Sequence, residues 1–98
     1  MMGIRNMPRK QFNETIEKAF KGVESLLNGM LKDRSVPRNI KRVAQRAIEI
    51  LDKAEETPGI LASNIMYLIG DLSMDPNIPF ASRTTIYRII ALLENIKD

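Results

Sequence analysis

The chain has 98 residues, of which 44% are apolar and 28% are charged, the composition of one ordinary globular domain. It contains no cysteine and no histidine, which excludes disulfide bonds and thiolate chemistry and removes the commonest metal ligand and general base. The net charge of +3 is divided unevenly, because basic residues prevail in residues 1–12 and 30–46 and acidic residues prevail after residue 46. The folded protein should therefore present a basic region and an acidic region.

We expect residues 1–98 to form a single all-helical domain, with residues 1–10 as a flexible N-terminal extension. Residues 1–8 lack the continuous apolar stretch of about 7–15 residues that a signal peptide needs. The longest apolar runs, residues 65–69 and 89–93, have five residues each, far fewer than the roughly 18–20 that cross a bilayer. These features predict a cytoplasmic protein without a membrane segment.

The first predicted helix begins near Phe12, where apolar residues start to recur at intervals of three and four. These residues are Phe12, Ile16, Ala19, Phe20, Val23, Leu26, Leu27 and Met30. Gly29 interrupts the pattern and lowers helix stability by about 1 kcal/mol relative to alanine. We therefore expect a long amphipathic helix whose last turn frays or kinks.

The second predicted helix follows the segment from Asp33 to Pro37, where proline cannot donate a hydrogen bond to the preceding turn. We expect the hydroxyl group of Ser35 to cap this helix. At about 100° per residue, apolar residues fill one side and polar residues fill the other. The apolar side is Ile40, Val43, Ala44, Ala47, Ile48, Ile50 and Leu51, and the polar side is Arg38, Lys41, Arg42, Gln45, Arg46 and Glu49.

The third predicted helix begins at Thr57 and Pro58, an N-cap residue followed by proline at the first helical position. Residues 57–70 contain no charged side chain, so we expect this helix to be covered on more than one side. We expect it to end by Met74, because Pro76 disfavours a helical backbone at Asp75. A fourth helix then follows the next proline turn.

An internal repeat relates the two halves of the chain. Residues 77–79 (Asn-Ile-Pro) repeat the pattern of residues 35–37 (Ser-Val-Pro) 42 positions later, and Asp33 matches Asp75 at the same interval. A period of about 40 residues is typical of HEAT-like helical repeats, but two units are too few for a solenoid. We therefore predict an all-α four-helix bundle made of two helix-turn-helix hairpins related by this repeat.

The strongest polar feature is the basic side of the second helix, and its candidate nucleic-acid-binding residues are Arg38, Lys41, Arg42 and Arg46. Three of them, Arg38, Arg42 and Arg46, stand on successive turns and form a ridge about 12 Å long that could follow a phosphate backbone. No aromatic residue accompanies them to stack on bases, so the contact would be mainly electrostatic. The other interpretation, which we favour, is the solvated face of an amphipathic helix.

A second candidate surface is apolar and belongs to the fourth helix. Phe80, Tyr87 and Ala91 point away from the main stripe, which is Ile86, Ile89, Ile90, Leu93 and Ile96. A helix that is apolar on two sides is either central in the fold or paired with another chain. We favour the central position and keep self-association as the alternative.

No constellation of reactive residues is evident in the sequence. Five scattered glycines form no phosphate-binding loop. Asp71 and Asp75 stand four residues apart and could hold a magnesium ion, but Pro76 argues against the helical backbone at Asp75 that this needs. We therefore expect no catalytic, cofactor-binding or metal site, no small-molecule substrate and no enzymatic activity.

Four short motifs carry a resemblance. They are Ser35-Val36-Pro37-Arg38-Asn39-Ile40, Asp75-Pro76-Asn77-Ile78-Pro79, Arg83-Thr84-Thr85-Ile86-Tyr87 and Leu92-Leu93-Glu94. Through them the segment from about Val23 to Asn95 resembles the archaeal uncharacterised protein family 0147, with Tyr87 standing where a tryptophan is expected. The resemblance leaves out the first dozen residues. It implies an archaeal, cytoplasmic, all-helical protein and brings no known activity, substrate or cofactor.

The sequence offers no reactive site, so its exposed surfaces are the candidate functional features. Our first hypothesis is a non-enzymatic protein-interaction module, with a protein partner or a second copy of the chain as its ligand. The alternative is a nucleic-acid- or ribosome-associated accessory protein that binds through the basic side of the second helix. An enzyme is the least favoured hypothesis.

Overall fold

The computed structural model describes residues 13–97, so the predicted extension at residues 1–10 lies outside the described part of the chain. Residues 13–97 form four α-helices and one 3₁₀ helix, with no strand among them. The elements are α1 (Glu14–Lys32), α2 (Arg38–Asp52), α3 (Pro58–Gly70), η2 (Asp71–Met74) and α4 (Phe80–Glu94). The all-α fold predicted from the sequence is confirmed.

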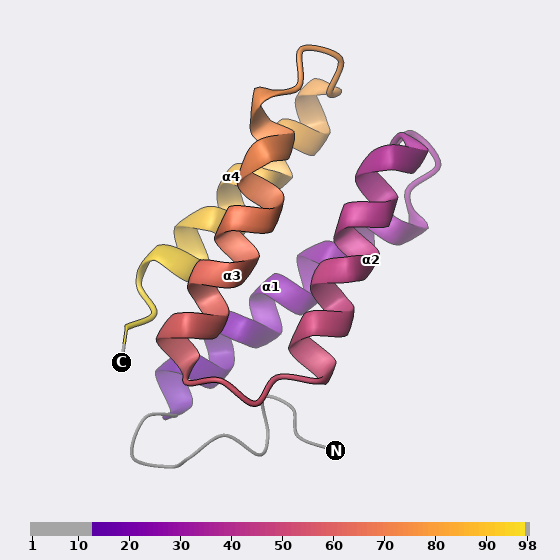
Figure 1. The fold of residues 1–98 in the computed structure, drawn as a ribbon. Helices are drawn as coiled ribbons and strands as arrows, with labels where there is room; N and C mark the ends of the chain where they lie inside the picture. Colours follow the sequence, from indigo (N-terminus) through magenta and orange to yellow (C-terminus); the bar gives the residue numbers. More distant parts are fainter. Residues whose placement is uncertain (1–12, 98) are drawn as a thin grey trace.

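Helices α1 and α2 form one hairpin, and α3 and α4 form a second hairpin beside it (Figure 1). Helix α1 packs mainly against α2 and α4, and α3 packs mainly against the same two helices. The four helices therefore form a ring in which none is surrounded by the other three. The expectation of a central fourth helix is wrong, because each helix in such a ring has one side left for solvent.

No membrane-spanning segment is found among the helices of residues 13–97.

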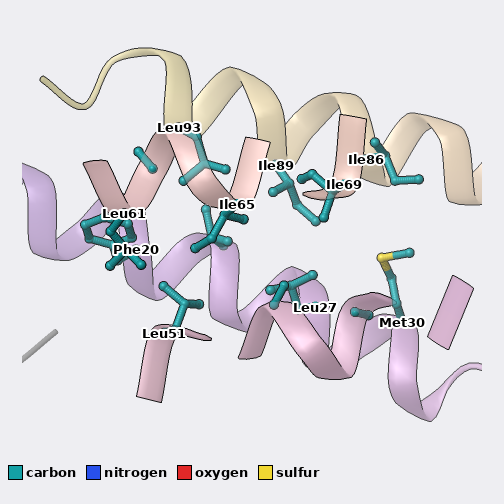
Figure 2. Close-up of a cluster of buried hydrophobic side chains, with 14 of the residues drawn as sticks. Phe20, Leu27, Met30, Leu51, Leu61, Ile65, Ile69, Ile86, Ile89 and Leu93 are labelled. Carbon is teal, nitrogen blue, oxygen red and sulfur yellow. The ribbon is translucent and has the colours of Figure 1, made fainter. Parts of the chain in front are cut away.

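The core fills the inside of this ring. On α1 the buried side chains are Ile16, Phe20, Val23, Leu27 and Met30, the set that the spacing of three and four predicts. Phe20, Leu51, Leu61 and Leu93 come from four different helices and lie in one apolar cluster (Figure 2). Burying side chains of this size contributes about 1.5–3 kcal/mol each. The shared cluster therefore holds the two hairpins together.

Asp33, and not the predicted cap at Ser35, organises the turn between α1 and α2. One carboxylate oxygen of Asp33 accepts hydrogen bonds from the backbone N–H of Ser35 at 2.9 Å and from its hydroxyl group at 2.7 Å. Helix α2 begins after Pro37 without a side-chain cap. The prediction that Ser35 caps α2 is wrong, because Pro37 occupies the N-cap position and the hydroxyl group of Ser35 is directed to the carboxylate two residues earlier, a strong charged acceptor.

The turn that leads into α4 has the same backbone pattern. Asp75 accepts a hydrogen bond at 2.9 Å from the backbone N–H two residues later, as Asp33 does. Val36 and Ile78 are both 7% exposed, and the prolines that follow them both have φ of −59°. The two turns therefore match, whereas a duplication of the complete hairpin remains a prediction.

Helix α3 has the predicted ends, and one of its sides is open to solvent. It begins at Pro58, and η2 closes the helical segment at Met74. Asp75 then takes an extended backbone with ψ of 119°. Helices α2 and α4 both pack against α3, in agreement with the expectation that it is covered on more than one side. The remaining side of α3 is open to solvent, because Ile60 is 49% exposed and Tyr67 is 82% exposed, so the uncharged stretch also includes a neutral surface.

Candidate interaction surfaces

Large apolar side chains are exposed on the second hairpin. The exposed fractions are 49% for Ile60, 82% for Tyr67, 81% for Met74, 85% for Phe80 and 54% for Tyr87. All five lie on α3, η2 or α4, and among the described residues of α1 and α2 no large apolar side chain is exposed to this degree. Exposed apolar side chains that are grouped on neighbouring elements are typical of interaction sites.

Helix geometry places these side chains opposite the core. Ile60 and Tyr67 are seven residues apart and therefore lie on one side of α3. Phe80, Tyr87 and Ala91 are spaced by seven and four and share one side of α4, where all three are exposed. Helices α3 and α4 pack against each other. We call Ile60, Tyr67, Phe80, Tyr87 and Ala91 the outer face of the second hairpin.

Two polar side chains on the α4 part of the outer face satisfy their hydrogen bonds on the helix itself. The hydroxyl group of Thr84 donates to the carbonyl oxygen of Phe80 at 3.1 Å. The side-chain amide of Asn95 donates to the carbonyl oxygen of Ala91 at 3.3 Å. Because these donors already have acceptors, covering the face would not leave these two groups without partners.

The sequence predicts only part of the outer face. Phe80, Tyr87 and Ala91 form the predicted candidate interface, and all three lie on the solvent side of α4. Ile60 and Tyr67 are not predicted, because an uncharged stretch such as residues 57–70 also indicates burial. The spacing of seven between these two large side chains, away from the stripe of Leu61, Ile65 and Ile69, was the available signal.

The predicted basic side of α2 is exposed at three of its four residues. Arg38, Arg42 and Arg46 are exposed, whereas Lys41 is half-buried and close enough to the turn for its charge to act on Asp33. None of the three arginines forms an ion pair with a carboxylate of the described residues. We call Arg38, Arg42 and Arg46 the basic ridge.

An open hollow of about 600 Å³ lies beside the basic ridge. Its lining includes Arg42, Arg46 and Lys53, and also Glu49 and Glu56. The hollow is therefore charged with both signs, and its carboxylates would repel a phosphate group placed inside it. An anionic ligand would be better accommodated along the ridge than in the hollow.

A smaller hollow of about 170 Å³ lies between α1 and α4. Asp33 is the one carboxylate in its described lining, where it is accompanied by Ser25, Ser82 and Thr85. This lining offers no pair of titratable groups for acid–base chemistry. Within residues 13–97 no three acidic side chains are grouped as a metal site would require.

The sequence model of the uncharacterised protein family UPF0147 matches residues 6–96. The chain belongs to UPF0147. The match begins earlier than the resemblance carried by the motifs, which started near Val23 and left out the first dozen residues. UPF0147 similarity thus includes residues 6–12 and all four helices.

Individual UPF0147 proteins confirm the relationship. A relative from Methanothermobacter thermautotrophicus is 38% identical over 96 residues, which cover 98% of this chain and 86% of the relative. One from Methanocaldococcus jannaschii is 36% identical over 84 residues, which cover 86% and 90%. The crystal structure of a UPF0147 protein from Thermoplasma acidophilum has a TM-score of 0.81 at 28% identity and covers 87% of this chain and 100% of that chain. The UPF0147 family carries no described activity.

Proposed function

We propose that this protein is a non-enzymatic interaction module that binds a protein partner through the outer face of the second hairpin. The observation that carries the proposal is the exposure of two aromatic rings, with Tyr67 82% and Phe80 85% exposed. Aromatic side chains are enriched among the residues that contribute most to protein interfaces. Their burial against a partner would remove a large apolar area from water.

The charge of the outer face favours a protein over a polyanion. Residues 57–70 carry no charged side chain, so α3 offers no cation to a phosphate group. The centres of protein interfaces are likewise depleted of charged residues and enriched in aromatic ones. The chemistry of this face therefore matches another protein surface.

The experiment is an affinity pull-down from native cell extract, with and without nuclease. We expect the parent to retain specific proteins after nuclease treatment and a Tyr67→Glu, Tyr87→Glu variant to lose them, because buried carboxylates without partners strongly oppose association. The proteins are identified by mass spectrometry.

A matched control is Thr15→Glu, Gln45→Glu, which adds the same two charges at exposed positions on α1 and α2. This control should retain the proteins that the parent retains. Equal retention by the parent and by the Tyr67→Glu, Tyr87→Glu variant would refute the proposal.

A second candidate function is nucleic-acid binding through the basic ridge. The observation that favours it is that Arg38, Arg42 and Arg46 are exposed and have no carboxylate partner among the described residues. Arginines on successive turns are about 6 Å apart along the helix, close to the spacing of phosphates along one strand. Binding of this kind would be weak and would decrease steeply as the salt concentration rises.

This candidate is tested with a labelled RNA and a labelled DNA at low salt. We expect Arg42→Glu, Arg46→Glu to abolish binding, whereas Lys18→Glu, Lys21→Glu, which makes the same change in net charge on α1, should reduce it only slightly. If the parent binds neither nucleic acid, or if both variants lose binding equally, the basic ridge is not a specific binding surface.

A further inference from the structure

A buried serine on α4 stands at a position where the first hairpin has an isoleucine. Ser82 is 4% exposed and is the one buried polar residue among residues 13–97. The residue 42 positions earlier, after the matching turn, is Ile40, which is 1% exposed and belongs to the core. Serine fills less space than isoleucine and adds a hydroxyl group. The hollow of about 170 Å³ between α1 and α4 is lined by Ser82.

The hydroxyl group of Ser82 has no hydrogen-bond partner among the described residues. Its neighbours Thr84 and Thr85, by contrast, donate to carbonyl oxygens one turn earlier, at 3.1 Å in both cases. Within residues 13–97 the one unpaired side-chain atom that is fully enclosed is Nε of Arg83, so the Ser82 oxygen keeps access to the hollow. Buried polar groups nearly always have a partner. This one indicates a bound molecule in the hollow.

The sign of the charge in the hollow is set by Asp33. One oxygen atom of Asp33 accepts both hydrogen bonds from Ser35, and its other oxygen atom accepts none from the described residues. No cationic side chain belongs to the described lining, and Lys41 acts on Asp33 from outside it without forming an ion pair. The last turn of α1 and the first turn of α4 meet here, and their opposite dipole ends oppose each other. The hollow is therefore negative.

We propose that this hollow binds the ammonium group of a short alkylamine. An ammonium group has three donors, which match the free oxygen of Asp33 and the hydroxyl groups of Ser25 and Ser82 in the lining. A water molecule takes about 30 Å³ in the liquid, so the hollow has room for about five heavy atoms, the size of n-butylammonium. Apolar side chains that suit an alkyl chain complete the lining; they are Leu26, Met30, Val36 and Ala81.

Two sources share this chemistry, a free amine and the side chain of a lysine on another protein. Both end in an alkylammonium group, but the lysine side chain also brings its backbone to the mouth of the hollow. The proposal concerns a different part of the molecule from the outer face and does not depend on the proposed function. Tyr67→Glu, Tyr87→Glu should therefore bind n-butylammonium as the parent does.

The test is an NMR titration of the full-length chain with n-butylammonium, followed through the backbone amide signals of Met30 and Ser82. We expect saturable shifts with a dissociation constant of about 1 mM, because five heavy atoms limit the affinity of such a ligand. 1-Butanol has the same size and no charge, and it should bind about tenfold more weakly. Lysine with both backbone groups blocked as amides distinguishes the sources: affinity equal to that of n-butylammonium assigns the site to a protein-borne lysine, and weaker binding assigns it to a free amine.

Two substitutions act on the two polar groups that carry the proposal. Asp33→Asn keeps an oxygen atom for the hydrogen bonds from Ser35 and removes the charge, so the dissociation constant should rise about tenfold. Asp75→Asn makes the same change in the matching turn, outside the described lining, and should leave the constant unchanged. Ser82→Ala should weaken binding several-fold and yet raise the midpoint of urea denaturation, because it removes an unpaired hydroxyl group from the interior.

Loss of binding in Ser82→Ala cannot be attributed to unfolding if this variant is at least as stable as the parent. The absence of saturable shifts with n-butylammonium overturns the proposal. So does equal affinity for 1-butanol, or equal affinity of the parent and Asp33→Asn for n-butylammonium, since either result removes the role of the carboxylate.

Discussion

Asp33 holds the α1–α2 turn through one oxygen atom that accepts two hydrogen bonds from Ser35. The side-chain hydrogen bond first, then the backbone hydrogen bond, and to a lesser extent the charge of Lys41 keep the pKa of Asp33 below its ordinary value of 3.8. A carboxyl group with a lowered pKa stabilises the folded state above its unfolded pKa, and this stabilisation is lost as the pH falls through the folded pKa. The turn should therefore loosen only in acid below pH 3.8.

Replacing Ser35 tests this account at a single residue. Ser35→Ala removes the hydroxyl donor and keeps the backbone N–H, so the pKa of Asp33 should rise toward 3.8. The measurement is an NMR titration of the Asp33 carboxyl carbon, with exposed Ser63→Ala as a control that leaves the value unchanged. An Asp33 pKa that is the same in the parent and in Ser35→Ala would contradict the role of the hydroxyl group.

Two glycines of α1 show how packing modifies the intrinsic stability of a helix. The sequence predicts that Gly29 frays or kinks the last turn, yet α1 continues without a break to Lys32. A Cβ atom at Gly29 would meet no other atom within 4 Å, whereas one at Gly22 would lie 3.1 Å from the Cδ1 atom of Leu92 on α4. Gly22 therefore allows a close approach between α1 and α4, and Gly29 does not.

This difference predicts opposite outcomes for one substitution at two positions of one helix. Gly29→Ala should raise the free energy of unfolding by about 0.5–1 kcal/mol, the intrinsic advantage of alanine inside a helix. Gly22→Ala should give no such gain, because displacing Leu92 offsets it. Urea denaturation of both variants measures the difference, and an equal gain at the two positions would show that α1 and α4 do not pack this closely.

Across the whole molecule, the two hairpins carry different chemistry on their exposed surfaces. The first presents the basic ridge on α2, and the second presents aromatic rings on α3 and α4. Helices α2 and α4 are not neighbours in the ring. A ligand on the basic ridge of α2 would therefore leave the exposed side of α4 accessible.

Much of the fold could be predicted from local patterns. The spacing of apolar residues predicts the buried side of α1, and the proline turns predict where α2 and α4 begin. The prediction of Ser35 as a cap is wrong, because the direction of its hydroxyl group, which points to the carboxylate of Asp33, depends on the geometry of the folded turn. The candidate site was predicted in part, through Phe80, Tyr87 and Ala91.

The sequence by itself determined four helices, their core-facing stripes, the family and the places where charge is concentrated, because these depend on periodicity and on side-chain chemistry within short segments. Only the tertiary structure decided whether the sides of each helix away from its core-facing stripe are covered by a neighbouring helix or exposed to solvent. An uncharged or apolar side, as at Tyr67 or Tyr87, is compatible both with burial and with exposure, and the packing of the four helices decides between the two. The packing of the two hairpins left those rings outside the core.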